Sequence, residues 1–285
     1  MKVLLTGHTG QVGWELQRCL GPLGRVIAPG RAALDLGRPD RVAAFVRSIG
    51  PGLIVNAAAF TAVDRAESEA DACFAVNAAS VAVLAQEAAR SGALLVHYST
   101  DYVFDGAGRV PYVETDAPAP INAYGRSKLA GEQAIVASGC RHLILRTGWI
   151  YAMRGRNFVL TMLRLARQQP QLRVVDDQCG APTWARDLAR ATRVALSRPA
   201  PLEGLYHVAA GGVTTWFGLA QRIVQLAGLA TPVVAIPTSE YPTPAARPAW
   251  SVLDCNRFAA ATGERIGPWD ERLAACFKDS DSARG

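Results

Sequence analysis

Apolar residues in the first half of the chain come in short continuous runs, separated by longer amphipathic, alanine-rich stretches. Such runs are typical of strands that are covered by helices on both faces. The expected strands are Lys2–Thr6, Arg25–Ala28, Leu53–Ala57, Leu94–Ser99 and His142–Thr147. The expected helices between them are Gln11–Leu20, Pro39–Ile49, Ala72–Ser91 and Tyr124–Ser138. This alternation predicts βαβ units in a Rossmann-like, doubly wound parallel sheet of the α/β class.

The pattern loosens in the second half of the chain. The expected elements there are helices Asn157–Gln168, Trp184–Ser197 and Thr215–Ala227 and strands Leu172–Val175 and Leu205–Val208. The segment Val233–Pro248 is rich in proline and is expected to be an irregular loop over a substrate site. We therefore expect residues 1–150 to bind a dinucleotide. Residues 151–285 should form mainly a smaller α/β substrate-binding region, with some elements returning to the Rossmann sheet.

Composition narrows the class of protein. Of 285 residues, 50% are hydrophobic and 19% are charged, which fits a soluble globular chain. The net charge of +6 is spread along the chain without a nucleic-acid motif. It suits an anionic small ligand or simply a solvated basic surface. No signal peptide or membrane span is expected, so we predict a cytoplasmic protein. The six scattered cysteines are then expected to be free thiols.

Three glycines follow the first expected strand and open the first expected helix. They are Gly7, Gly10 and Gly13, with Gln11 and Val12 between the last two. Glycine allows a sharp turn and a close approach of the backbone to a pyrophosphate. The helix start offers that anion unpaired N–H groups and a partial positive charge. Glycines after strands also occur for purely structural reasons, but this context predicts a dinucleotide-binding loop.

The end of the second expected strand indicates which dinucleotide is preferred. NAD sites usually place an acidic residue there for the ribose 2′-hydroxyl. This chain has Ala28–Arg31 instead, and Arg31 suits a 2′-phosphate unless it is an ordinary surface residue. Asp35 and Leu36 follow and are expected beside the adenine. We predict a preference for NADPH, with NADH also usable.

Three small residues, Ala57, Ala58 and Ala59, come at the end of the third expected strand. They leave room for a cofactor that lies across the carboxyl edge of the sheet. Close packing of a helix on the sheet would also select small side chains, so both interpretations stay open. We include the three alanines in the expected cofactor site.

A tyrosine and a lysine four residues apart, Tyr124 and Lys128, share one face of the fourth expected helix. A nearby ammonium, together with the positive nicotinamide of the oxidised cofactor, is expected to lower the pKa of the tyrosine from its usual value near 10. In the reduction of a ketone, Tyr124 would donate a proton to the developing alkoxide, and Lys128 would also hold the cofactor. Thr100, after the fourth strand, is expected to polarise the substrate carbonyl, with Ser99 as the alternative. His97 is expected to be a core residue.

With these motifs the chain resembles the extended short-chain dehydrogenase/reductase superfamily, and within it the dTDP-4-dehydrorhamnose reductase family. The resemblance covers nearly the whole chain. Its further motifs are Ser99–Phe104, Arg146–Tyr151, Gly155–Phe158, Asp177–Thr183 and Tyr241–Pro248. It implies reduction of C4 of dTDP-4-dehydro-6-deoxy-L-mannose to dTDP-L-rhamnose, with Thr100, Tyr124 and Lys128 at the catalytic positions.

The resemblance also implies a set of contacts to the sugar or nucleotide. The residues at those positions are Val103, Phe104, Trp149, Gln178 and Arg247. Arg247 suits a diphosphate oxygen, and Trp149 suits packing against a sugar face unless it is a plain core residue.

The chain departs from the family pattern at two places. Ala246 stands where some members carry a second arginine, so we expect a weaker grip on the diphosphate. Some members are described as dimers bridged by Mg²⁺ through glutamates. Glu15 is present here, but Arg186 occupies the matching region, which makes a metal-bridged dimer doubtful. We expect no metal site, and a homodimer stays open.

Three other functions share part of this sequence pattern. A sugar-nucleotide dehydratase usually carries Thr-Asp-Glu after the fourth strand, but Tyr102 replaces the glutamate here. A reductase for another dTDP-4-keto-deoxysugar remains an alternative, because one sequence does not determine the stereochemistry of the substrate pocket. A non-catalytic NADP-binding subunit, like the regulatory subunit of methionine adenosyltransferase, need not keep Thr100, Tyr124 and Lys128 together. No nucleic-acid or membrane partner is expected.

Overall fold

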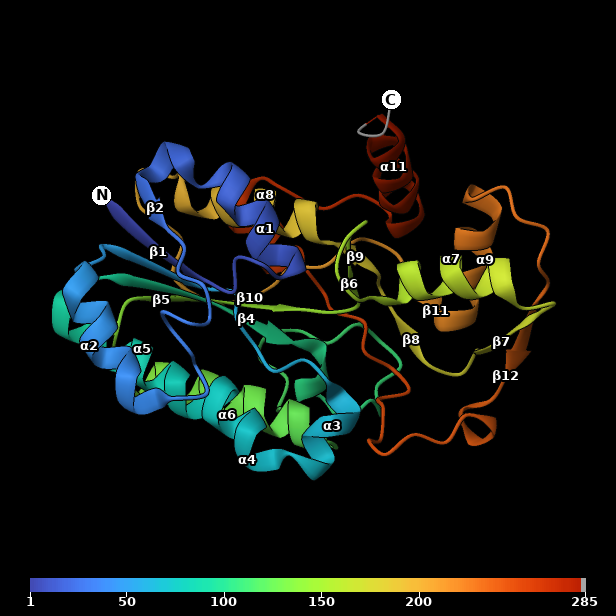
Figure 1. The fold of residues 1–285 in the computed structure, drawn as a ribbon, viewed down its shortest axis with the longest axis horizontal. Helices are drawn as coiled ribbons and strands as arrows, with labels where there is room; N and C mark the ends of the chain where they lie inside the picture. The colour runs from blue at the N-terminus through green and yellow to red at the C-terminus, as the bar shows by residue number, and fades with distance from the viewer. Residues whose placement is uncertain (283–285) are drawn as a thin grey trace.

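Six parallel strands form the central sheet of the protein in this computed structural model, which describes residues 1–282 (Figure 1). Their order is β10-β5-β4-β3-β1-β2. The strands are β1 Lys2–Thr6, β2 Arg25–Ile27, β3 Leu53–Asn56, β4 Leu94–Thr100, β5 His142–Thr147 and β10 Gly204–His207. The predicted strands lie within one residue of these bounds. The Rossmann-like parallel sheet is confirmed.

Successive residues of the strands are buried on opposite faces of the sheet, as the two-residue repeat of a strand requires. In β1, Val3 and Leu5 belong to one apolar cluster, and Leu4 belongs to another on the opposite face. Every residue of β3 and β4 is buried. Both faces are therefore covered, which explains the continuous apolar runs in the sequence.

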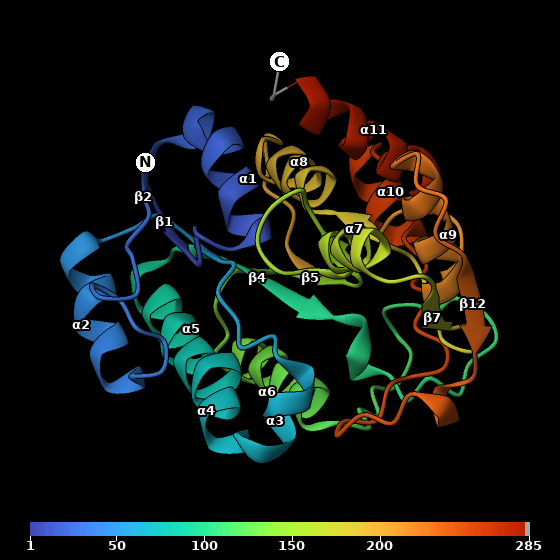
Figure 2. The ribbon, with the colours of Figure 1, turned by 45° about the vertical axis from the view of Figure 1, so that its right-hand side comes forward.

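Helices lie on both sides of this sheet (Figures 1 and 2). On one face α1 (Gln11–Cys19) packs against α8 (Ala185–Leu196), which comes from the second half of the chain. On the other face α5 (Ser80–Ser91) packs against both α2 (Pro39–Ile49) and α6 (Ala123–Ala137). Since β10 also joins the sheet beside β5, the second half of the chain contributes to both layers.

The longest apolar helical stretch is part of the core. It consists of α4 (Ala70–Phe74), a π-helical turn at Ala75–Ala79 and α5. By length and composition this stretch could cross a membrane, yet 44% of its most apolar window is buried inside the fold. At the π-helical turn the buried Asn77 donates to the Phe60 carbonyl oxygen at 3.0 Å and to Ser127 Oγ at 3.0 Å. The bond to Ser127 ties the helix to α6, and the bond to Phe60 ties it to the loop after β3.

A smaller region lies beside the carboxyl ends of the central strands (Figure 1). Its helices pack around one apolar cluster that includes Leu219, Ile223 and Leu273. The elements of this region are β6 Ile150–Tyr151, α7 Phe158–Gln168, β7 Leu172–Val175, β8 Cys179–Gly180, β9 Thr183–Trp184, β11 Thr214–Thr215, α9 Trp216–Leu226, β12 Val233–Ile236 and α11 Trp269–Ser282. The sequence pattern missed α3 (Val63–Ser68), α10 (Asn256–Thr262) and α11.

The proline-rich segment is only partly irregular, so the expectation of a loop over Val233–Pro248 is wrong at its start. Residues Val233–Ile236 form β12, which pairs in parallel with β7. Pro232 and Pro237 lie just outside the strand, where a missing N–H does not interrupt the ladder. After β12 the segment contains one 3-10 turn at Thr238–Glu240 and is otherwise irregular up to Pro248.

Candidate active site

A cavity of about 1100 Å³ opens at the carboxyl edge of the central sheet. Loops that follow β1, β3 and β4 form its floor, and residues 147–157 with Trp216 form a wall from the smaller region. The cavity brings together most residues that the sequence assigned to a site. They are Gly7, Gly10, Gln11, Val12, Arg31, Asp35, Leu36, Ala57, Ala58, Ala59, Thr100, Tyr124, Lys128 and Trp149.

The glycine loop leaves no room for side chains. Gly7 has a φ of 67°, and a Cβ there would lie 2.5 Å from the backbone nitrogen of Ala58. Gly13 does not line the cavity, but a Cβ there would lie 2.1 Å from the Gly7 carbonyl oxygen. Glycine at both positions therefore lets the loop, β3 and α1 pack closely.

The start of α1 is open to an anion. Its N-cap residue, Gly10, carries no side chain to accept a bond from the helix, so the first N–H groups of α1 lack a side-chain cap. Those groups and the positive end of the helix dipole lie at the cavity beside Gln11 and Val12. The loop and helix start thus fit the pyrophosphate of a dinucleotide.

The far end of the cavity carries one exposed arginine. The Arg31 side chain is 83% exposed, and its Nε lies 3.2 Å from Asp35 Oδ1. Hydrogen bonding from the Gly37 N–H lowers the pKa of Asp35, and Arg31 lowers it further. No acidic residue stands between β2 and Arg31. Leu36 is buried beneath the loop at 5% exposure. The guanidinium is thus free to reach a phosphate here, although Asp35 competes for it.

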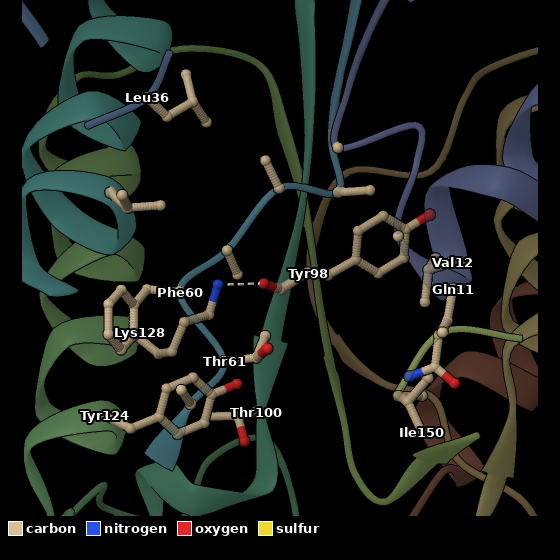
Figure 3. Close-up of a pocket in the computed structure, with 18 of the residues that line it drawn as sticks. Gln11, Val12, Leu36, Phe60, Thr61, Tyr98, Thr100, Tyr124, Lys128 and Ile150 are labelled. Carbon is tan, nitrogen blue, oxygen red and sulfur yellow. Dashed lines mark hydrogen bonds between the residues drawn. The ribbon is translucent and has the colours of Figure 1, made fainter. Parts of the chain in front are cut away.

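Lys128 lies on α6 and points into the cavity floor (Figure 3). Its side chain is 1% exposed, and its Nζ donates to the Tyr98 carbonyl oxygen at 2.5 Å. The same Nζ lies 3.1 Å from His97 Nε2. Burial lowers the pKa of Lys128 to about 8, against an opposing effect of Glu132. At pH 7 the lysine is therefore still mainly charged, but it loses its proton far more readily than an exposed lysine.

Tyr124 lies one turn before Lys128, with its hydroxyl beside Thr100 (Figure 3). Burial raises the pKa of Tyr124, and hydrogen bonding with Thr100 opposes that rise. The phenol is therefore protonated at neutral pH and can donate. Lowering of this pKa by Lys128 together with an oxidised nicotinamide stays a prediction.

Close backbone packing fixes where α6 begins. Its N-cap, Asn122, accepts from the Gly125 N–H at 2.8 Å. A Cβ at Gly125 would lie 2.1 Å from the Tyr102 carbonyl oxygen, and one at Gly131 would lie 2.2 Å from the Asn77 carbonyl oxygen. Both glycines let α6 approach β4 and the π-helical turn, which brings Tyr124 to the strand end that carries Thr100.

Asp101 is a site residue that the sequence did not single out for the reductase. It is 3% exposed, and its Oδ1 accepts from Thr100 Oγ1 at 3.0 Å. Burial raises the pKa of Asp101 to about 6, although hydrogen bonds from Ser251 and Thr100 oppose the rise. In the sequence, only its position directly after Thr100 indicates that Asp101 belongs to the site. The carboxylate orients the hydroxyl that was expected to face the substrate carbonyl.

Val103 and Phe104, which the family resemblance places at the sugar or nucleotide, are not among the residues that line the cavity. Both side chains have 0% exposure. Thr100 caps a 3-10 turn at Asp101–Val103 that carries the chain away from the cavity. Phe104 instead stacks on Tyr112 with ring centroids 4.1 Å apart.

Gln178 and Arg247 also lie outside the residues that line the cavity. Gln178 accepts from Trp216 Nε1 at 3.1 Å, so it holds a tryptophan that does line the cavity. Arg247 donates to both carboxylate oxygens of Asp64 at 2.7 Å. The guanidinium of Arg247 is therefore paired with a carboxylate outside the cavity.

Trp149 and Trp216 form an aromatic wall of the cavity. Their rings stack with centroids 3.5 Å apart and planes at 1°. Trp149 has a φ of 50°, the one positive value at a non-glycine position in residues 1–282. Such a backbone costs energy and is found where function or packing holds it. A Cβ at Gly180 would lie 2.4 Å from the Trp149 ring, so glycine there makes room for it.

Arg186 occupies the place where a Mg²⁺ bridge between glutamates would lie. Arg186 Nε lies 3.3 Å from Glu15 Oε2, and its Nη1 pairs with Asp279. In the part of the chain that the structure describes, no group of three potential metal ligands occurs. The residues present do not fit Mg²⁺, because an internal cation already neutralises both carboxylates.

The chain matches the family described as RmlD substrate binding domain over residues 1–282. It is 50% identical to the dTDP-4-dehydrorhamnose reductase of Escherichia coli K12 over 90% of this chain and 91% of that protein. The enzyme of the same name from Burkholderia thailandensis is 47% identical over 98% and 99% of the two chains. A crystal structure of the Bacillus anthracis dTDP-4-dehydrorhamnose reductase with NADP matches at a TM-score of 0.93 and 36% identity, over 98% and 99% of the chains. The protein therefore belongs to the RmlD family of dTDP-4-dehydrorhamnose reductases.

Proposed function

We propose that the protein uses NADPH to reduce the C4 keto group of dTDP-4-dehydro-6-deoxy-L-mannose, forming dTDP-L-rhamnose. One observation carries the proposal: a single cavity is lined both by the glycine loop and by Thr100, Tyr124 and Lys128. A redox enzyme needs its cofactor site and its proton donor to share one space. Relatives that bear this enzyme name cover nearly the whole chain.

The dinucleotide would lie across the carboxyl edge of the sheet. The pyrophosphate would be bound by the start of α1, and the adenosine 2′-phosphate by Arg31. NADPH supplies the hydride. A solved relative was crystallised with NADP, which supports this choice. NADH would bind less well because it cannot pair with Arg31.

Three side chains would handle the proton and the carbonyl. Tyr124 is protonated and donates to the oxygen that becomes the C4 hydroxyl. Thr100, at the strand end beside Tyr124, would donate to the same oxygen after its hydroxyl proton turns away from Asp101, to which it donates in this structure. Lys128 is held by Tyr98 and has donor capacity left for the nicotinamide ribose. Its positive charge also favours removal of the proton from Tyr124 in the transition state.

The substrate would enter between the sheet and the smaller region. We assign the sugar face to the wall of Trp149 and Trp216, because a flat ring pair suits an apolar sugar face. Arg247 would bind a diphosphate oxygen after exchanging its partner Asp64, and Gln178 would act by holding Trp216. We also propose a cytoplasmic location and a homodimer.

The direct test is an assay with dTDP-4-dehydrorhamnose and NADPH. We expect oxidation of NADPH and a product with the C4 configuration of rhamnose. Turnover to the opposite C4 configuration, or with another dTDP-4-keto-deoxysugar alone, would assign the protein to a different reductase. Tight NADPH binding without any turnover would indicate a regulatory subunit.

The role of Tyr124 is tested by Tyr124→Phe. We expect kcat to fall by about 10²- to 10⁴-fold with NADPH affinity nearly unchanged, because only the proton donor is lost. Tyr112→Phe is a matched control, since it removes a phenol hydroxyl from a tyrosine that does not line the cavity. Near-normal turnover in Tyr124→Phe would show that another group donates the proton.

A further inference from the structure

A row of polar side chains crosses the sheet beneath the cavity. Thr6 of β1 is the register partner of Asn56 of β3, and Asn56 is the register partner of His97 of β4. The three side chains have exposures of 3%, 1% and 0%. The row ends at Lys128 of α6 and begins at Thr6, which lines the cavity next to the glycine loop. We call these four residues the buried ladder.

Each neighbouring pair in the buried ladder is hydrogen-bonded. Thr6 Oγ1 donates to Asn56 Oδ1 at 2.6 Å, and the Asn56 amide Nδ2 donates to His97 Nδ1 at 3.0 Å. His97 Nε2 lies 3.1 Å from Lys128 Nζ. Polar groups this deeply buried need partners of opposite type, because an unmatched buried donor or acceptor is destabilising.

His97 carries one ring proton rather than two. Burial lowers the pKa of His97 well below its ordinary value, and the charge of Lys128 lowers it further. A neutral imidazole donates from one nitrogen and accepts at the other. When Lys128 is an ammonium it donates to Nε2, so the ring proton must be at Nδ1. The protonation state of Lys128 therefore determines whether His97 donates or accepts in its hydrogen bond with Asn56.

The ladder consequently has two hydrogen-bonding states. With Lys128 neutral, His97 donates from Nε2 to the lysine, the Asn56 amide donates to His97 Nδ1, and Thr6 donates to Asn56; the Asn56 amide has this orientation in the structure. With Lys128 charged, the Asn56 amide is turned by 180°, so that His97 Nδ1–H donates to the Asn56 oxygen and the Asn56 amide donates to Thr6. An amide exchanges donor and acceptor in this way without a change of shape. Only the state with Lys128 charged leaves the Thr6 hydroxyl proton free for the cavity.

We propose that the buried ladder couples the charge of Lys128 to the hydroxyl of Thr6, so that an anionic cofactor group that accepts from Thr6 favours the charged lysine. The proposal deepens the proposed function and rests on it, because it assumes a dinucleotide phosphate at the glycine loop. His97 and Asn56 are then positioning residues, which act through Lys128 and Thr6 and touch neither substrate nor cofactor.

Other groups also act on the charge of Lys128 and must be separated from the ladder. Those that face it are Glu132 and Tyr124 on its own helix, Cys73 on α4 and His97 on β4. Glu132 favours the charged lysine whether or not a ligand is bound. Thr6 does not contact Lys128, so a change at Thr6 that alters the protonation of Lys128 can act only through the ladder or through the ligand.

The first test reads the tautomer of His97 directly. Long-range ¹H–¹⁵N correlation of the protein with NADP⁺ at neutral pH distinguishes the protonated ring nitrogen, and the chain has only four histidines to assign. We expect the proton at Nδ1. A proton at Nε2 under these conditions would overturn the proposal, because Lys128 could not then donate to the ring.

The second test measures proton uptake when NADPH binds near pH 8, by calorimetry in buffers of different ionisation enthalpy. We expect uptake by the wild type, about half of that or less in Thr6→Val, and restoration in Thr6→Ser, which keeps the hydroxyl. A Thr6→Val variant with weaker affinity but unchanged uptake would reduce Thr6 to a structural contact and overturn the coupling.

Lys128→Met separates failure of the ladder from failure of the proposed function. This variant should take up almost no proton on binding NADPH, because the titrating group is gone. Unchanged uptake with Lys128→Met would show that another group titrates and would overturn the coupling. Near-normal turnover of that variant would instead remove Lys128 from the proposed mechanism, whatever the result at Thr6.

Discussion

Replacing Lys128 by methionine should change how the stability of the protein depends on pH. The ammonium is almost fully buried, and burial lowers the pKa of Lys128 from 10.5 to about 8. One pKa unit corresponds to about 1.4 kcal/mol, so the folded protein holds this proton about 3 kcal/mol less tightly than the unfolded chain. The charged lysine therefore destabilises the cofactor-free fold.

The sign of the effect follows from which state holds more protons. Between about pH 8 and pH 10.5 the unfolded chain keeps the lysine proton and the folded protein has lost it, so rising pH favours folding. From pH 7 to pH 10 the free energy of unfolding of the wild type should gain about 2.5 kcal/mol relative to Lys128→Met. At any single pH the variant also loses donors to Tyr98 and His97, so the comparison must be across pH.

The measurement is urea unfolding of both cofactor-free proteins at the two pH values, extrapolated linearly to water. Groups that titrate equally in both proteins cancel in the difference. Lys2→Met, which removes an exposed lysine, is the control and should show no such change. If the difference between wild type and Lys128→Met stays constant within about 0.5 kcal/mol, the lysine is not desolvated as its burial implies.

Three further outcomes are expected. Gly13→Ala should weaken NADPH binding at least about tenfold and lower the stability of the fold, because the added Cβ would lie 2.1 Å from a backbone oxygen. Binding is measured by titration with NADPH, and the control is Gly21→Ala, because the space around Gly21 is open. Glu132→Gln should lower the free energy of unfolding by about 3–5 kcal/mol, because Arg146, whose side chain is 3% exposed, would be left buried without its carboxylate partner. Urea unfolding measures this change, and a loss below about 1 kcal/mol would contradict the prediction. Arg31→Ala should reduce the ratio of kcat/KM for NADPH over NADH about tenfold, and a wild-type preference for NADH would refute the assignment of Arg31.

The expected elements that proved right depend on signals within short stretches of chain. Continuous apolar runs located β1 and β3 to within one residue, because strands covered on both faces need no polar positions. The glycine loop was recognised because its turn demands glycine regardless of distant contacts. β12 was missed, since its flanking prolines suggested a break although they lie just outside the ladder.

Chain-local chemistry by itself therefore determined the parallel sheet, the dinucleotide loop and the placement of Tyr124 and Lys128 on one helix face. Only the tertiary structure decided which side chains reach the cavity: it buried Phe104, set Trp216 against Trp149, and linked Lys128 to Thr6 through two strands. Periodicity and turn chemistry depend on neighbours in sequence, whereas a side chain's partner depends on which distant segments pack against it. Burial also raises the pKa of Tyr124, an effect that sequence could not give because desolvation depends on the whole assembled fold.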